Sequence, residues 1–343
     1  MSKILSLAIP TFNRKDSLLR SLNNISNQTD SIKKNLFEIV ISDNCSTDQT
    51  GEVVSLWMTE NPEINLKYNK NNSNYGYDIN CHKAIEMSSG KYVWLISDDD
   101  FLKDHSIKKV IEYLNLDTDY SFCYVNYDLN VNNTISDSDC SIKTTKINDG
   151  NQMIVDTNLA FSFITSCIYN REVWKSLNYD NYYDTAWYNF YAARDCIIQG
   201  KNLLIGEPLV TQFGLDLKKR RNEKKNSKIR GYEFYIGAHL RFLSLAYNLK
   251  DYGYSSNTNY YAQNLSWSYN LRQIIYYKIT QDRYNSDEIR KVIYEMSIYF
   301  KNRSIFWLIH VPTLVMPNTL IRCIYNLTLP IYKKLKLVQS LML

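Results

Sequence analysis

The sequence predicts an α/β protein in which a doubly wound, mostly parallel β-sheet is followed by a C-terminal helical region. Over the first hundred residues, short apolar runs such as 4–9 and 37–42 alternate with segments of helical periodicity. After residue 230, Tyr and Leu recur at helical spacing, and strand signals of comparable strength are missing. Ligands of a doubly wound sheet bind beyond the C-terminal ends of its strands, so the candidate site is sought there.

Each element follows from a local pattern. The run 4–9 is closed by Pro10, and the run 37–42 is closed by a polar cluster, as expected for buried parallel strands. Between them, Leu18, Leu22 and Ile25 fall on one face of a helix. The same reasoning predicts further strands at 64–68, 91–97, 120–127, 160–170 and 202–205, helices at 16–29, 50–60, 78–88, 104–116 and 186–199, and a polar loop at 128–150.

The predicted organisation has three parts. Residues 1–215 form the sheet domain, and the mixed, mostly basic run 216–230 is a linker or loop. Residues 231–343 form the helical region, which ends in an apolar and basic tail at about 304–343. From residue 301 onward there are six Lys or Arg and no Asp or Glu, and prolines interrupt every apolar stretch before it reaches membrane-spanning length. A tail lying on an anionic membrane surface is therefore expected, with an ordinary buried helix pair as the alternative.

Composition excludes several classes of protein. The 343 residues are 45% hydrophobic, which is ample for a core, and the net charge of +5 is concentrated in the tail, so no nucleic-acid partner is expected. The seven cysteines are scattered without a C-x-x-C pair, which disfavours structural zinc and a disulfide framework. The N-terminus lacks an apolar stretch long enough for a secretory signal. The predicted location is the cytoplasm, peripheral on the inner face of the cytoplasmic membrane.

Polar clusters follow three of the predicted strands, at 10–14, 42–48 and 97–100. In a parallel sheet these strand ends converge on one edge. Three consecutive Asp residues repel one another unless they are solvated or neutralised, and Mg²⁺ or Mn²⁺ would neutralise them through hard oxygen ligands. Such a cation would also stabilise a departing diphosphate. Taken singly, these residues are also common in turns and helix caps.

Four motifs carry a resemblance to a known family. They are I-P-T-F-N-R at 9–14, I-S-D-N-C-S-T-D at 41–48, N-Y-G-Y at 74–77 with Asn80 and Ala84, and S-G-K-Y-V-W-L-I-S-D-D-D at 89–100. Over about its first hundred residues the chain resembles the family 2 glycosyltransferases of the GT-A fold, and most of all the bacterial O-antigen transferases of the abequosyltransferase kind. The resemblance implies that residues 1–215 are a catalytic domain that binds a nucleotide-sugar.

The resemblance also implies the site residues. Ser97 stands where the family often has the first Asp of a D-x-D-D sequence, which leaves the metal ligand ambiguous by one residue. Asp99 and Asp100 are the metal candidates. The implied nucleotide-sugar site comprises Pro10, Thr11, Asn13, Arg14, Asp43, Asn44, Asp48, Asn74, Gly76, Asn80 and Asp98.

The chain departs from the family pattern at the position of the general base. The family usually has an E-D-x-x-x-x-x-R stretch before a Gly that precedes the last strand, but here residues 187–189 before Gly200 are Trp, Tyr and Asn. The nearest acids are Asp184 and Asp195, and Asp184 is the preferred candidate because inversion needs a carboxylate or imidazole near the acceptor hydroxyl. A surface role for Asp184 and an ion pair for Asp195 are the alternatives.

The sequence thus predicts an inverting glycosyltransferase. It would move a sugar from a nucleotide-sugar donor to a saccharide acceptor, expected on a polyprenyl diphosphate carrier, in the synthesis of O-antigen or another surface polysaccharide. A nucleotidyltransferase is one alternative, but residues 10–15 contain no Gly and so lack the Gly-rich loop expected of it. A binding or scaffold protein that keeps the pocket without the base is the other.

Overall fold

The protein divides into two compact units in the computed structural model. The first comprises Met1–Glu223 with Leu249–Ala262, and the second comprises Lys224–Asn248 with Gln263–Leu343. The structure describes residues 3–116, 119–131, 134–137, 143–179, 182–212, 238–265, 274–275, 286–300, 304, 306–317, 319–321 and 323–324. The predicted linker 216–230 lies outside these residues, and the predicted domain boundaries stay predictions.

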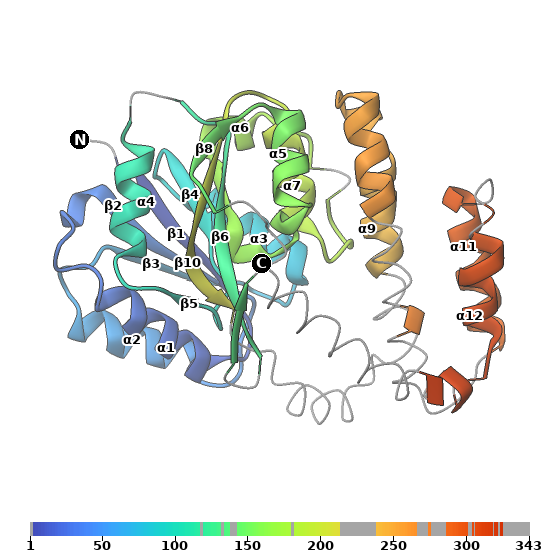
Figure 1. Ribbon diagram of the computed structural model, residues 1–343. Coiled ribbons are helices and arrows are strands. Elements are labelled where there is room, and N and C mark those ends of the chain that lie inside the picture. Colours follow the sequence, from blue (N-terminus) through green and yellow to red (C-terminus); the bar gives the residue numbers. More distant parts are fainter. Residues whose placement is uncertain are drawn as a thin grey trace. The chain divides into compact units, whose positions relative to one another are not determined.

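The first unit is built on a ten-stranded mixed sheet with the order β3-β2-β1-β4-β9-β6-β10-β5, to which β7 and β8 add at β6 and β10 (Figure 1). Its N-terminal part, β3-β2-β1-β4, is parallel as the alternating pattern predicts. Beyond β4 the pairing is mostly antiparallel, with a parallel β6–β10 pair. The strands are β1 (Leu5–Thr11), β2 (Phe37–Asp43), β3 (Leu66–Lys70), β4 (Tyr92–Leu95), β5 (Phe101–Leu102), β6 (Phe122–Val131), β7 (Thr134–Asp137), β8 (Lys146–Asn148), β9 (Cys167–Asn170) and β10 (Asn202–Gln212).

Helices pack against the sheet, and the core of this unit lies between the sheet and these helices. Strand β1 is apolar and fully buried at Leu5, Leu7 and Ile9, because it lies between β2 and β4. The helix α3 packs on β1 and β2, and α7 packs on β9. The α/β class is therefore confirmed. The helices of this unit are α1 (Lys15–Ser26), α2 (Thr50–Glu60), α3 (Tyr77–Glu86), α4 (Ser106–Leu114), α5 (Gly150–Thr157), α6 (Arg171–Lys175) and α7 (Tyr188–Ile197).

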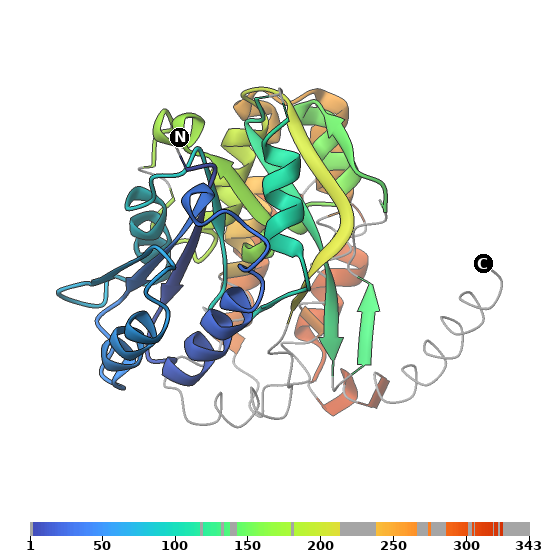
Figure 2. The ribbon, with the colours of Figure 1, turned by 90° about the vertical axis from the view of Figure 1, so that its left-hand side faces the viewer.

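Three segments differ from the predicted elements. Segment 160–170 is a strand only at β9 and otherwise forms two 3-10 turns, η2 (Ala160–Ser162) and η3 (Ile164–Ser166). The predicted polar loop 128–150 contains β7, β8 and the end of β6, because backbone groups there pair with neighbouring strands despite the low strand preference of Asn and Asp. The last strand continues beyond residue 205 through irregular pairing with β6 around Pro208, and it curves visibly beside β6 in Figure 2.

The second unit is helical in its described residues, as predicted. Helices α9 (Ala238–Tyr247), α11 (Ser286–Phe300) and α12 (Val311–Val315) occur with a π-helical turn, η6 (Phe306–His310). Their apolar side chains form a separate core that includes Val292, Phe306 and Leu314. Within the described parts of the chain, no helix has both the length and the apolar character that crossing a membrane requires. The helical turn η5 (Leu249–Tyr252) and most of the helix at 256–265 belong to the first unit.

Gly90 is required where the chain enters β4 alongside β1. A Cβ atom at this position would lie 2.7 Å from the backbone nitrogen of Ser6, which is fixed in the sheet. We expect Gly90→Ala to lower the free energy of unfolding by about 1–3 kcal/mol through overpacking, measured by chemical denaturation. The control is Gly51→Ala in α2, where the Cβ would meet only the end of the Tyr68 side chain. Equal losses for both variants would contradict this explanation.

Candidate functional site

Strand β1 delivers the first group of site residues. Thr11, its last residue, donates from Oγ1 to Oδ2 of Asp98 at 2.6 Å. Arg14, at the start of α1, donates from Nη1 to Oδ1 of Asp98 at 3.0 Å and to Oδ2 of Asp99 at 2.6 Å. The ends of β1 and β4 are thus joined by a hydrogen-bonded and ionic network.

The loop after β2 is organised by Asp43, which is fully buried. Its Oδ1 accepts from the backbone of Ser46 at 2.8 Å, and its Oδ2 accepts from the Tyr68 hydroxyl at 2.6 Å. Burial, together with the neighbouring carboxylate, raises the pKa of Tyr68 well above its ordinary value, so this hydroxyl stays a donor. Asp43 therefore stabilises the conformation of this loop from its buried side.

Two further predicted residues tie the β1 and β2 loops together. Asn13 adopts a left-handed conformation, with φ of 53°, and its Oδ1 accepts from the backbone of Thr47 at 2.8 Å. Asp48 accepts from the backbone of Lys15 at 3.0 Å and from the Thr50 hydroxyl at 2.5 Å. These contacts fix the start of α1 against the start of α2.

A cluster of amides joins β2 to the start of α3. The Asn44 side chain donates to Oδ1 of Asn74 at 2.7 Å and to the carbonyl of Gly76 at 3.1 Å. Asn80 accepts from the hydroxyl of Ser42 at 2.8 Å and donates to the Thr11 carbonyl at 3.3 Å. Gly76 has φ of +85°, a conformation that disfavours any side chain and lets α3 begin at this turn.

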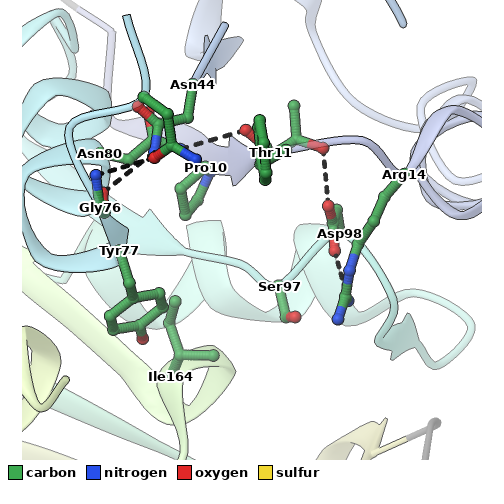
Figure 3. Close-up of a pocket in the computed structure, with 12 residues that line it drawn as sticks. Pro10, Thr11, Arg14, Asn44, Gly76, Tyr77, Asn80, Ser97, Asp98 and Ile164 are labelled. Carbon is green, nitrogen blue, oxygen red and sulfur yellow. Dashed lines mark hydrogen bonds and ion pairs between the residues drawn. The ribbon is translucent and has the colours of Figure 1, made fainter. Parts of the chain in front are cut away.

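These groups surround a cavity of about 400 Å³ at the C-terminal ends of β1, β2 and β4 (Figure 3). Amide side chains line one part of it, and Arg14, Ser97 and Asp98 line another. The volume falls within the range of small-molecule sites. The lining residues are Pro10, Thr11, Phe12, Arg14, Asn44, Asn74, Gly76, Tyr77, Asn80, Ser97, Asp98 and Ile164.

Most of the residues predicted for the nucleotide-sugar site line this cavity. Asn13, Asp43 and Asp48 do not line it, but they hydrogen-bond to the loops that surround it. Four lining residues were missed by the sequence reasoning. Phe12 and Ser97 lie inside motifs that were recognised, and Tyr77 ends a third, so each could have been included. Ile164 gave no signal, because it comes from a 3-10 turn in a segment whose apolar pattern predicted a strand.

Burial raises the pKa of Asp98 to about 6, although the charge of Arg14 and the Thr11 hydroxyl oppose that shift. Asp99 is partly exposed and, besides Arg14, accepts from the Ser97 hydroxyl at 2.6 Å. Asp100 is buried and accepts from the hydroxyl of Thr165. Within the described residues, no three His, Cys, Asp or Glu side chains are grouped so that they could hold a metal ion. Neither Asp99 nor Asp100 lines the cavity.

The two candidate bases have different surroundings. Asp184 is exposed and left-handed, with φ of 59°, in the segment before α7. Asp195 lies in α7, where both its oxygens accept from the Arg194 guanidinium, at 2.6 and 2.8 Å, and Oδ2 also accepts from the Tyr182 hydroxyl. Neither residue lines the cavity.

Comparison with known proteins defines the class of the chain. Residues 6–177 match the family described as Glycosyl transferase family 2, and the chain belongs to this family. It is 31% identical over 192 residues to the abequosyltransferase RfbV of Salmonella typhimurium, which covers 52% of this chain and 56% of that protein. It is 32% identical over 111 residues to a GalNAc(5)-diNAcBac-PP-undecaprenol beta-1,3-glucosyltransferase of Campylobacter jejuni, covering 32% of this chain and 34% of that protein. The chain thus spans about half or less of these relatives' length.

Solved structures support the GT-A fold. The chain is similar to residues 1–349 of TarS from S. aureus in complex with UDP-GlcNAc, with a TM-score of 0.62 and 15% identity over 91% of this chain and 84% of that one. It is also similar to a mannosyltransferase from Pyrobaculum calidifontis in complex with GDP-Man and Mn²⁺, with a TM-score of 0.52 and 13% identity over 95% of this chain and 88% of that one. At these identities the likeness concerns the fold alone.

The Thr11 hydroxyl is expected to stabilise the folded protein, because it satisfies a carboxylate that is 4% exposed. Replacing Thr11 by Val keeps the shape but leaves one oxygen of Asp98 without this donor. We expect a loss of about 1–3 kcal/mol in the free energy of unfolding, measured by urea denaturation. The control is Thr59→Val on the exposed face of α2. A Thr11→Val protein as stable as the control would contradict the assigned role of this bond.

Proposed function

We propose that this chain is an inverting glycosyltransferase that binds a nucleotide-sugar in the cavity at the ends of β1, β2 and β4 and transfers the sugar to a saccharide acceptor. One observation carries the proposal. In a member of glycosyl transferase family 2, amides, a hydroxyl, an arginine and a buried carboxylate converge on a cavity at the carboxyl edge of the parallel strands. That edge is where sheets of this kind bind ligands.

The two parts of the cavity suit the two ends of a nucleotide diphosphate. Asn74 and Asn80 line this part of the cavity with amide groups of the kind that recognise a base and a ribose, while Asn44 holds Asn74 and Gly76 in place through its own amide hydrogens. Arg14 offers a planar set of donors that matches phosphate oxygens. Asp98 is suited to accept from a ribose hydroxyl, as the resemblance implies.

A divalent cation, Mn²⁺ or Mg²⁺, fits the donor set in part. Asp99 supplies a hard carboxylate oxygen, and Asp98 and Asp99 together carry more negative charge than Arg14 neutralises. Asp99 is the better candidate ligand because it is partly exposed, whereas Asp100 is buried against Thr165. When bound, the cation would supply charge neutralisation for the diphosphate leaving group. The Pyrobaculum mannosyltransferase complex, which contains Mn²⁺, supports this proposal.

The proposed chemistry is a single displacement. The acceptor hydroxyl attacks the anomeric carbon of the donor sugar, the bond to the diphosphate breaks, and a carboxylate takes the hydroxyl proton. Asp184 is the proposed base because it is exposed, whereas both oxygens of Asp195 are already bonded within α7 and to Tyr182. Arg14 would stabilise the charge that develops on the diphosphate.

The acceptor is proposed to be a lipid-linked saccharide in the synthesis of O-antigen or another surface polysaccharide. The named acceptor of the Campylobacter relative, a saccharide on PP-undecaprenol, supports this class. Large apolar side chains of the second unit are exposed, among them Ile298, Trp307 and Leu308, and the chain after residue 301 is basic. These features support a peripheral contact with the inner face of the cytoplasmic membrane.

A second function, nucleotide-sugar binding without catalysis, is favoured by one observation. At the position of the family's acidic pair the chain has Trp187 and Tyr188. The scaffold function would be excluded if the wild type transfers sugar and Asp184→Asn lowers the turnover at least about 100-fold with nucleotide affinity unchanged. General base catalysis contributes that much. Membership of the glycosyltransferase family counts against a nucleotidyltransferase.

The donor site is tested by nucleotide binding. We expect one of UDP, GDP, CDP and dTDP to raise the melting temperature of the full chain in the presence of Mn²⁺, measured by differential scanning fluorimetry. Asp99→Ala should abolish the metal-dependent part of the shift, because it removes a proposed ligand. The control is Asp104→Ala, which alters an exposed carboxylate near α4. Stabilisation by none of the four nucleotides would remove the main support for the donor site.

The membrane contact is tested with vesicles. The full chain should sediment with vesicles of anionic phosphatidylglycerol and not with neutral phosphatidylcholine. Replacing Leu308, whose exposed fraction is 74%, by Glu should weaken this binding about tenfold or more, because one fewer apolar side chain is buried and a negative charge is added. The control is Leu116→Glu, which alters an exposed leucine, 56% exposed, in the first unit. Equal binding of both variants would contradict the proposed surface.

A further inference from the structure

Asp78 is a buried carboxylate that no part of the proposed chemistry uses. It lies in the first turn of α3 and has an exposed fraction of 4%. Its Oδ2 accepts from the backbone nitrogens of Thr185 at 2.7 Å and Ala186 at 2.8 Å, and its Oδ1 accepts from that of Tyr188 at 3.0 Å. A single side chain thus binds three backbone donors more than a hundred residues away.

These donors belong to the N-terminal end of α7. Trp187, the residue before the helix, makes no capping hydrogen bond with its own side chain. Asp78 supplies the acceptor from another helix, and its charge complements the positive end of the α7 dipole. Burial raises the pKa of Asp78, while the backbone donors act in the opposite direction.

The segment that Asp78 holds is strained. Asp184 and Ala186 both have positive φ, 59° and 62°, which is unfavourable for residues with a Cβ atom. Strained backbone persists when surrounding contacts overdetermine it, and it is concentrated at functional sites. Here the surrounding contacts are the bonds from Asp78 and a bond from the Trp187 nitrogen to the Thr185 hydroxyl at 3.0 Å.

The helix that follows this segment, α7, is bonded to a residue that lines the donor cavity. Tyr77, the neighbour of Asp78, lines the cavity, and its hydroxyl donates to Oδ1 of Asn189 at 3.3 Å. Asn189 in turn donates to the carbonyls of Phe161 at 3.1 Å and Ser162 at 2.9 Å, next to the turn that brings Ile164 to the cavity. Tyr77 and Ile164 lie on the same side of the site in Figure 3. Helix α7, which follows the segment, is therefore bonded to one residue that lines the cavity, Tyr77, and to the turn next to another, Ile164.

We propose that Asp78 is a positioning residue that fixes segment 184–187 at the edge of the donor cavity, and that this segment forms the subsite for the acceptor saccharide. The proposal rests on the proposed glycosyl transfer. Asp78 does not act as the base itself, because it is buried and both its oxygens are occupied. The segment offers the exposed carboxylate of Asp184 and the ring of Trp187, and carboxylates and aromatic rings recognise the hydroxyls and apolar faces of sugars.

The first test is whether Asp78 holds the segment. Asp78→Asn replaces one acceptor oxygen by an amide that cannot accept from the backbone. Hydrogen exchange of the full chain, followed by mass spectrometry, should show faster exchange at residues 185–188 in this variant. The matched control is Asp156→Asn, which alters another buried carboxylate, bonded to Asn148 and Gln152. Unchanged exchange at residues 185–188 would overturn the proposal, whatever the activity.

The second test separates the acceptor from the donor. Binding of the stabilising nucleotide, measured by calorimetry, should stay within about twofold in Asp78→Asn, because no donor contact is removed. Transfer to octyl mannoside, octyl glucoside or octyl galactoside should fall at least about tenfold in kcat/KM for the acceptor, since small misplacements of a bound reactant are costly.

The outcomes of these experiments separate a positioning role of Asp78 from a general structural role. A parallel loss of nucleotide affinity and transfer, or a loss of the same size in Asp156→Asn, would show a general structural role and overturn the proposal. A wild type that binds the nucleotide but transfers to none of the octyl glycosides would count against the acceptor subsite. Failure of the wild type to bind any nucleotide would instead contradict the proposed function, while the exchange experiment would still test the contact itself.

Discussion

The site depends on the parallel register of β1 with its two neighbours. Thr11 pairs with Asp43 in β2, and Ala8 pairs with Leu95 in β4, so the three strands end at the same edge of the sheet. Side chains in a strand alternate between its faces, and a shift by one residue would reverse them. The buried apolar side chains of β1 resist such a shift. Ordinary core packing therefore brings the polar ends of these strands together.

Once the strand ends meet, the structure must compensate two buried or half-buried carboxylates, Asp98 and Asp99. Arg14 and Thr11 provide this compensation in the structure. Arg14 and the two carboxylates are also suited to a diphosphate and a cation. Arg14 would bond to phosphate oxygens and a carboxylate would bond to the cation, so each group would exchange one charged partner for another. In the proposed donor site this polar network would be formed before the donor binds, which would reduce the ordering that binding requires.

The sequence predicts this half of the protein well because its signals are local. Apolar runs followed at once by Thr11, Asp43 or Asp98 indicate both the strand and the residues at its end. What depends on long-range contacts could not be predicted. Asp78 resembles any acid in the first turn of a helix, and its partners lie 107 to 110 residues further along the chain. Ile164 reaches the cavity only because its apolar segment turns into a 3-10 helix.

The proposed nucleotide-sugar site is the cavity at the ends of β1, β2 and β4. The most direct measurement is a crystal structure of the protein with a bound nucleoside diphosphate and Mn²⁺. We expect the base and ribose to lie among Asn44, Asn80 and Thr11, and the diphosphate to lie beside Arg14 and Asp99. A nucleotide bound elsewhere on the protein, with Arg14 still bonded to both carboxylates, would contradict this expectation.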